Sequence, residues 1–319
     1  MFKKILFSLC VALVGVAPVQ AAWPERTVTL IVPWAPGGST DILARMLSDY
    51  LTRSLGQTFI VENKAGASGN IGSNLVAKAK PDGYTLLVGS MSTHAMNQAL
   101  FSSMPFEPVD DFTPISLVAF VTNTLVINPK IAVNNVAELI AYAKANPKKL
   151  NFASAGAGST NHISAVLFEL AAGIQMTHIP YKGGAPAVLD TVAGQTEVLF
   201  GAGTQTLPHV KSGKLKLLAV TESARSPQLL DTPTVAETLP GYELVVWYGA
   251  FGPKDLPKEI TERLSTEINR IVALPEVRSK MAAIGVEVVS STPAGFAKTL
   301  QQDAAKFTKL IRELKITAE

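Results

Sequence analysis

The fold is decided by a predicted strand that runs directly into a glycine-rich turn and then a helix. This stretch reads Thr27-Val28-Thr29-Leu30-Ile31-Val32, followed by Pro33-Trp34-Ala35-Pro36-Gly37-Gly38-Ser39-Thr40-Asp41. Its first part is rich in β-branched and apolar residues, which is typical of a buried strand. From Thr40 to Leu55 the apolar residues fall on one helical stripe, and Gly56 ends the helix. The stretch therefore predicts a strand–turn–helix unit whose turn carries glycines and hydroxyls.

The same alternation of strands and helices continues along the chain, and it produces sheets covered by helices. We predict further strands at 59–61, 84–88, 124–127, 150–153, 176–180, 198–200 and 215–220, and an extended segment at 242–251. We predict further helices at 69–79, 136–145, 160–172, 185–192, 257–274, 276–284 and 293–315. The pattern predicts an α/β protein.

The 319-residue chain is long enough for two hydrophobic cores. We predict two Rossmann-like α/β lobes joined by two crossing strands. Residues 22–122 and 246–319 form the first lobe, and residues 123–245 form the second. The chain would cross near 121–124 and return near 244–247, so that the first lobe takes both ends.

The N-terminus has the features of an export signal. Lys3 and Lys4 precede an apolar run that is too short to span a membrane comfortably, and Val19 and Ala21 fit the −3 and −1 positions of a signal-peptidase site. We predict that residues 1–21 are removed, with cleavage after Ala21 or Ala22, and that the protein is exported. An uncleaved membrane anchor is the alternative.

Composition excludes several classes of protein. The apolar fraction of 47% and the charged fraction of 17% exclude a disordered chain, and a single cysteine excludes a disulfide scaffold. The formal net charge is +3, and Lys3 and Lys4 carry two of these charges, so the chain without its predicted signal segment is close to neutral. A nucleic-acid-binding protein needs a dense basic face, and we therefore predict no nucleic-acid partner.

Turns rich in glycine and hydroxyl residues follow the predicted strands. Glycine lets the backbone approach a ligand, and a serine or threonine cap leaves the first helical N–H groups free to bind an anion. Such turns gather at the carboxyl ends of the strands, so we predict a carboxylate site between the lobes. The alternative is that the turns are ordinary helix caps. The candidate ligand-binding residues are Trp34, Ala35, Gly37, Gly38, Ser39, Thr40, Ser90, Thr93, His94, Ser154, Gly158, Ser159, Thr160, Asn161 and Asp190.

For two of these candidates, Asp190 and Trp34, two interpretations are open. Asp190 is either a surface carboxylate or a cleft acceptor for a ligand amine or hydroxyl. Trp34 is either a core or cleft-wall aromatic or a stacking partner for the ligand.

Motifs of common enzyme classes are missing from the sequence: there is no G-x-S-x-G elbow, no G-x-x-x-x-G-K-[ST] loop and no H-E-x-x-H spacing. We predict no catalytic residues, no metal and no cofactor.

Five stretches of the sequence resemble the Bug family, the TctC-like periplasmic solute-binding receptors of tripartite tricarboxylate transporters. The resemblance is carried in order by Pro33 to Asp41, Val61 to Gly72, Pro81 to Leu87, His178 to Ala187 and Gly213 to Thr221. It implies a type II periplasmic-binding-protein fold in which two opposing loops, here Trp34–Thr40 and Ser154–Asn161, hold a carboxylate, with Ser90–His94 as a further wall. Asp190 matches an acidic position that meets the ligand's amino group in some members.

The sequence departs from the family pattern at Trp34, where phenylalanine is frequent, and in the Asn63 loop, which lacks the usual proline. The wider ring makes an aromatic carboxylate a candidate beside di- and tricarboxylates. The leading hypothesis is a monomeric receptor that binds a small carboxylate and delivers it to membrane permease subunits. The alternatives are a secreted hydrolase or transferase using Ser39 or Ser159 with a nearby histidine, and an input protein for a membrane sensor kinase.

Overall fold

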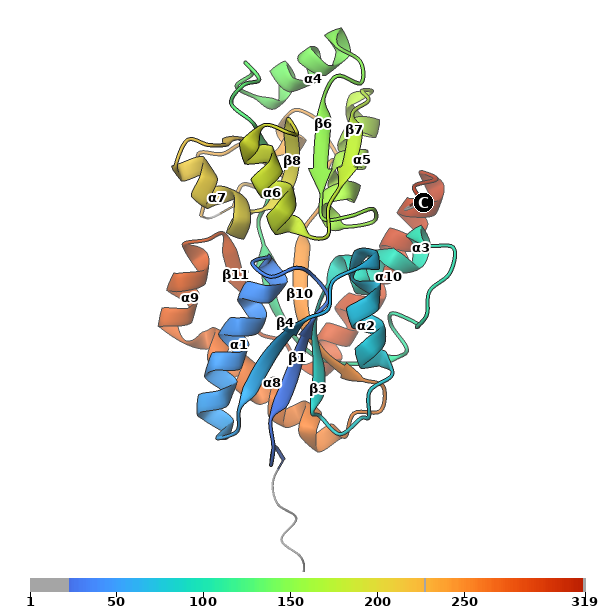
Figure 1. The fold of residues 1–319 in the computed structure, drawn as a ribbon, viewed down its shortest axis with the longest axis vertical. Coiled ribbons are helices and arrows are strands. Elements are labelled where there is room, and N and C mark those ends of the chain that lie inside the picture. The colour runs from blue at the N-terminus through green and yellow to red at the C-terminus, as the bar shows by residue number, and fades with distance from the viewer. Residues whose placement is uncertain (1–22, 227, 318–319) are drawn as a thin grey trace, which may run out of the picture.

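The computed structural model describes residues 23–226 and 228–317, in two lobes that each contain one β-sheet (Figure 1). The predicted signal segment 1–21 and both predicted cleavage positions lie outside the described residues. Each sheet is covered by helices, and the segments that join the lobes pass between them at the centre of the molecule. The prediction of two α/β lobes is confirmed.

The first lobe is built on a six-stranded mixed sheet in the order β11-β4-β10-β3-β1-β2. β1 pairs in parallel with β2 and β3, whereas β10 pairs antiparallel with β3 and β4. The strands are β1 (Val28–Val32), β2 (Phe59–Asn63), β3 (Thr85–Ser90), β4 (Phe112–Val121), β10 (Val246–Pro253) and β11 (Val286–Val288).

The second lobe is built on a five-stranded sheet in the order β7-β6-β8-β5-β9. β6 is parallel to both of its neighbours, whereas β5 is antiparallel to β8 and β9. The strands are β5 (Asn123–Ile127), β6 (Asn151–Ser154), β7 (Thr177–Pro180), β8 (Val198–Ala202) and β9 (Lys216–Val220).

Most helices lie where the apolar periodicity predicts them. In α1, Leu43, Leu47 and Leu51 are buried on one stripe, and the helix ends at Gly56, whose φ of 73° favours glycine. The first lobe also contains α2 (Asn70–Ala77), α3 (Asn97–Leu100), α8 (Lys258–Ala273), α9 (Pro275–Ala282) and α10 (Pro293–Glu313), with α1 at Ser39–Leu55. The second contains α4 (Val136–Ala145), α5 (Thr160–Ala172), α6 (Gly184–Ala193) and α7 (Gly203–Lys211).

Strand β4 and helix α7 were not predicted, and both contain a proline. In β4, Pro114 pairs with Phe251 beside a register shift, and β11 covers only the far end of the strand at 119–121. At Pro114 the strand therefore has a neighbouring strand on one side only. A proline is tolerated there because its missing N–H is not needed for a hydrogen bond within the sheet. Helix α7 contains Pro208 and lacks a continuous apolar stripe, so its sequence gives no clear helical signal.

The connections between the lobes are fixed by backbone hydrogen bonds. Thr122 separates β4 from β5; its N–H donates to Gly285 and its carbonyl accepts from Gly203. On the return path, the N–H of Leu244 donates to Thr221, and the Thr221 hydroxyl donates to the Leu244 carbonyl at 2.6 Å. The two paths run side by side, because Val121 at the end of β4 pairs with Val246 at the start of β10. Among the described helices, none is both long and apolar enough to cross a bilayer.

Candidate functional site

A small cavity of about 40 Å³ lies between the lobes, at the carboxyl ends of β1, β3, β6 and β8. Open α/β sheets bind ligands at this edge. Both lobes and the return strand β10 contribute to its lining. The lining residues are Trp34, Gly38, Ser39, Thr40, Ser90, Ser92, Asn123, Ala155, Ser159, Thr160, Asn161, Gly184, Ala202, Gln205, Val246 and Tyr248.

In the described part of the chain, four helices begin at this cavity. Residues at the starts of α1 and α5 line it (Gly38 to Thr40 and Ser159 to Asn161), as do Gly184 at the start of α6 and Ala202, the residue before α7. The first N–H groups of a helix have no partner within the helix, and the helix dipole places partial positive charge at the same end. The arrangement therefore favours an anion.

The lining carries this positive potential without a formal cation. Among the described residues that line the cavity, none is charged. Burial raises the pKa of Tyr248 to about 12, and a hydrogen bond with Ser39 partly offsets that shift, so the phenol remains a neutral donor. Hydroxyls and amides are hence the polar groups available to a ligand.

Most polar side chains around the cavity are already held by protein partners. Ser39 Oγ lies 2.7 Å from Thr204 Oγ1 and joins α1 of the first lobe to α7 of the second. Ser159 caps α5 by accepting the N–H of His162, and Ser90 Oγ lies 3.1 Å from Ser92 Oγ. A second contact joins the lobes where the Ser68 hydroxyl donates to the Ala157 carbonyl. The lobes thus touch at two or more places.

The structure brings together many of the predicted site residues. Trp34 is 9% exposed and lies beside Gly69, whose missing side chain leaves room for the indole ring. The predicted residues that line the cavity are Trp34, Gly38, Ser39, Thr40, Ser90, Ser159, Thr160 and Asn161.

The remaining predicted residues do not line the cavity. His94 is fully buried, with its ring stacked 4.0 Å from that of Phe251 and its Nδ1 bonded to Thr93 at 2.7 Å, so both side chains belong to the core. The N–H of Gly37 donates to Asp41 in the first turn of α1 at 3.0 Å. Ala35 packs against the backbone of Gly183, whose added Cβ would lie 3.0 Å from the Ala35 side chain.

Asp190 lies away from the cavity because of its position along α6. The helix starts at the cavity with Gly184, and a rise of about 1.5 Å per residue places Asp190 roughly 9 Å further along the axis. Its carboxylate instead bonds to Tyr181, and this bond adds to burial in raising the pKa of that tyrosine to about 12. Among the described lining residues, none therefore offers a carboxylate to a ligand ammonium group.

Ser154 and Gly158 form a layer behind the lining of the cavity. Ser154 Oγ lies 2.6 Å from His178 Nε2, and the N–H of Gly158 donates to His162 Nδ1 at 3.0 Å. The rings of His162 and His178 stack with centroids 4.2 Å apart. Because His162 Nδ1 accepts a hydrogen bond, a neutral ring holds the turn that carries Ser159 and Thr160.

The pKa of His162 and that of His178 are both lowered to about 4, in each case mainly by burial and for His162 also by the neighbouring His178. The unfolded chain takes up protons near pH 6.5, before the folded chain does, so this pair makes the protein less stable as the pH falls from about 6.5 to 4.

We expect His162→Asn to make this pH dependence shallower, by at most about 1.4 kcal/mol per pH unit, because asparagine cannot take up the proton. The asparagine oxygen can still accept the N–H of Gly158. Urea unfolding of the wild type and the variant at pH 8, 6, 5 and 4.5 measures the difference. An unchanged slope would contradict the assignment of the neutral pair.

The list of individual candidates left out the lining residues Ser92, Asn123, Ala155, Gly184, Ala202, Gln205, Val246 and Tyr248. Ser92 and Ala155 lie within the ranges Ser90–His94 and Ser154–Asn161 that the resemblance implied for the site, and Gly184 lies within the stretch His178 to Ala187 that carries the resemblance. Asn123, Val246 and Tyr248 lie on the crossing paths, where no local pattern marks a contact with ligand.

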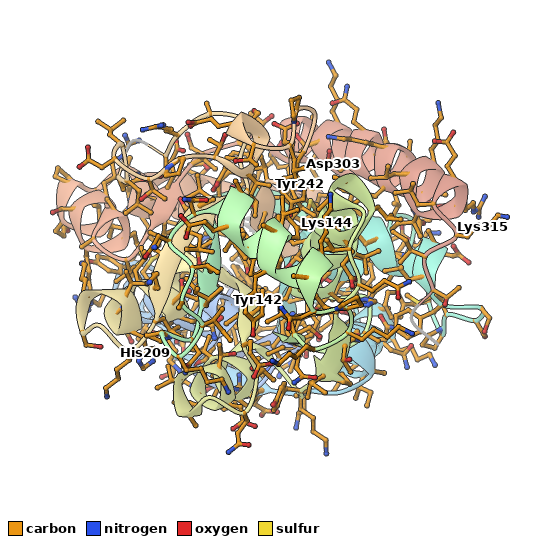
Figure 2. All side chains as sticks on the ribbon, turned by 90° about the horizontal axis from the view of Figure 1, so that it is seen from above. Tyr142, Lys144, His209, Tyr242, Asp303 and Lys315 are labelled. Atoms are coloured by element: carbon orange, nitrogen blue, oxygen red, sulfur yellow. The ribbon has the colours of Figure 1, made fainter. Side chains whose placement is uncertain are left out.

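A larger hollow of about 770 Å³ lies on the outer face of the second lobe, lined by residues of α4, of α5 and of the segment before β7. Figure 2 looks down on this face, where Tyr142 and Lys144 are labelled on α4. Gln175 and Met176 immediately precede β7, so the hollow lies at the amino end of that strand. The opposite edge holds the helix N-termini, and the smaller cavity is therefore the candidate site.

Within the described residues, no three histidine, cysteine, aspartate or glutamate side chains are grouped so as to hold a metal ion. The serines named in the hydrolase alternative are also placed unfavourably. Ser39 bonds to Thr204, and Ser159 accepts a backbone N–H rather than contacting a histidine ring. Ser154 does contact the ring of His178, but it does not line the cavity.

Comparison with known proteins gives one consistent family. The family profile described as "Tripartite tricarboxylate transporter family receptor" matches residues 43–316. A Rhodopseudomonas palustris structure described as Rpa4515 with adipate is 35% identical, with a TM-score of 0.90 over 93% of this chain and 99% of that one. The periplasmic binding protein BugD is 34% identical, with a TM-score of 0.88 over 92% of this chain and 99% of that one.

A third structure, MatC (Rpa3494) from Rhodopseudomonas palustris with bound malate, is 31% identical, with a TM-score of 0.87 over 91% of this chain and all of that one. The family and these neighbours are solute-binding receptors rather than enzymes, which excludes the hydrolase alternative. The predicted resemblance is confirmed along nearly the whole chain: this protein belongs to the Bug, or TctC-like, family of tripartite tricarboxylate transporter receptors.

Proposed function

We propose that this receptor captures a small carboxylate in the cavity between its lobes and delivers it to the permease subunits of a tripartite transporter. The observation that carries the proposal is the convergence of four helix N-termini on a cavity with an uncharged, hydroxyl- and amide-rich lining. Relatives of similar fold hold adipate and malate, which supports a carboxylate ligand. The protein performs no chemistry on the ligand.

The polar groups are sufficient for useful affinity. A hydrogen bond to a charged group contributes roughly 1.5–3 kcal/mol. Micromolar binding requires about 8 kcal/mol, so four or five such bonds can supply it after some loss to ordering. Helix N–H groups and the hydroxyls of Ser39, Ser159 and Thr160 supply donors in the lining.

We propose that capture works by hinge closure, with residues 22–122 and 246–319 moving as one lobe against residues 123–245. A cavity of about 40 Å³ has room for a few water molecules only, so a ligand enters when the lobes separate. The contacts between Ser39 and Thr204 and between Ser68 and Ala157 join the lobes in this structure and break when the lobes separate. A ligand that touches both lobes favours the closed state, because it makes its full set of contacts only there.

We also propose that the receptor acts in the periplasm as a monomer, after removal of residues 1–21 or 1–22. The family and the neighbouring periplasmic binding protein support this location. Purification from periplasmic extract, with sequencing of the N-terminus and measurement of the mass in solution, tests all three statements.

We expect the protein to bind at least one carboxylate with micromolar or tighter affinity in calorimetric titrations. The panel contains mono-, di- and tricarboxylates, both aliphatic and aromatic, with the corresponding amides as uncharged controls. Binding should also reduce the radius of gyration in solution scattering, because the lobes close. The absence of heat and of thermal stabilisation with every carboxylate, or a liganded crystal with its ligand outside the cavity, would contradict the proposal.

A further inference from the structure

One lining residue holds a polar group that the protein leaves without a partner. Gln205 lies on α7 and lines the cavity, and its side-chain nitrogen Nε2 is buried without a hydrogen-bond partner. A buried amide nitrogen in this state loses its hydrogen bonds to water and gains none in return, which is rare in native proteins. This atom is thus available to a bound molecule.

The other side-chain amides of the lining are committed to the protein. Asn123 Nδ2 donates to Ser164 Oγ at 3.0 Å, and Asn161 Nδ2 donates to the carbonyl of Phe200 at 2.5 Å. These bonds fix the two asparagines as structural groups of the second lobe. Among the three lining amides, Gln205 is therefore the one whose nitrogen is buried without any protein partner.

Gly184 leaves space that the Gln205 side chain occupies, and Gly38 lies in contact distance of the same side chain. A Cβ added at Gly184 would lie 2.5 Å from Gln205 Oε1 and 3.0 Å from Nε2, and one added at Gly38 would lie 3.9 Å from Nε2. The amide is consequently packed between the start of α1 in the first lobe and the start of α6 in the second. It reaches the junction where a ligand must contact both lobes.

We infer that Gln205 is a specificity-determining residue that donates a hydrogen bond to an acceptor group of the ligand, such as a second carboxylate. This inference rests on the proposed function and defines which carboxylates fit. Among the described residues, the lining holds no carboxylate, and Asp190 lies outside it. A ligand ammonium at this point would meet only neutral acceptors, such as the Gln205 amide oxygen, and no anion to pair with. The pocket is therefore selective for acids with a second acceptor and against their amino analogues.

The test compares ligands that differ only in the second group. Adipate, hexanoate and 6-aminohexanoate share one chain length, and the same trio is made for shorter and longer chains. At the chain length that fits the cavity, we expect the wild type to bind the dicarboxylate most tightly. The amino analogue of the same length should bind most weakly.

We expect Gln205→Leu to weaken dicarboxylate binding by about 10- to 100-fold and monocarboxylate binding by less than threefold. Gln205→Glu should weaken the dicarboxylate further, because two anions then face each other, and should improve binding of the amino analogue. Gln302→Leu, the same substitution at an exposed position of α10, serves as the matched control and should change neither affinity.

Gly184→Ala gives a second test that keeps the glutamine. The added methyl group displaces the end of the Gln205 side chain, which is flexible, so the fold should persist while the preference for dicarboxylates over monocarboxylates falls. Equal losses for both ligand classes in Gln205→Leu, or an unchanged preference in all three cavity variants, would overturn the assignment of Gln205. A wild type that binds no carboxylate at all would instead overturn the proposed function, and this inference with it.

Discussion

Thr160→Asp is expected to weaken carboxylate binding on the order of 100-fold without unfolding the protein. Thr160 is the first residue of α5, lines the cavity and is half-buried, so a side chain of similar size fits there. Two carboxylates about 5 Å apart repel by roughly 3 kcal/mol at an effective dielectric constant of about 20. An acidic residue in the first turn of a helix stabilises it by about 0.3–1 kcal/mol, so the melting temperature should not fall.

The matched control is Thr160→Asn, which has the shape of aspartate without its charge. We expect it to reduce affinity by less than about tenfold, since it removes at most one hydrogen bond to the ligand. Calorimetry with the tightest-binding carboxylate compares the two variants at neutral pH. Similar losses in both would mean that shape rather than charge matters at α5, and that the ligand's acid group does not lie there.

Gly249→Ala is expected to cost about 3 kcal/mol of unfolding free energy, a large effect for one methyl group. Gly249 lies in β10, and an added Cβ would meet the ring of Phe296 at 2.1 Å. Phe296 is fully buried, and its ring packs against Phe251 and Trp247 with centroids 4.9 and 5.5 Å away. The ring therefore has no space into which it can retreat.

A double-mutant cycle with Phe296→Leu separates this clash from other effects. Leucine lacks the outer ring atoms that the new methyl group would meet, so Gly249→Ala should cost only about 1 kcal/mol in that background. Urea unfolding of the four proteins gives the coupling energy. Additive losses would show that the cost arises from the strand backbone and not from the contact with Phe296.

The course of the chain was largely predictable from its sequence. Helices at 136–145 and 160–172 begin and end where the periodicity predicts, because Asn135 and Ser159 accept N–H groups at their starts and Gly173 ends the second. These signals involve residues a few positions apart, and local geometry suffices to fix them. β4 and α7 were missed because Pro114 and Pro208 disturb the local pattern, while long-range packing compensates.

The candidate site was predictable only where it follows a marked turn. The starts of α1 and α5 line the cavity as the glycine- and hydroxyl-rich turns indicated, but His94 came from a turn of the same kind and lies in the core. Composition identifies a turn that can bind a ligand. It does not show whether the side chains of that turn point toward the cavity or into the lobe.

The sequence by itself determined the class of fold, the family and the two turns that open α1 and α5, because each rests on neighbouring residues. Only the tertiary structure decided that α6 and α7 also begin at the cavity, that Asp190 lies further along its helix, and that Gln205 meets the first lobe with a free donor. These facts depend on the strand order β7-β6-β8-β5-β9 and on how one lobe closes against the other. Both are set by contacts between residues far apart in the chain, and no local pattern records them.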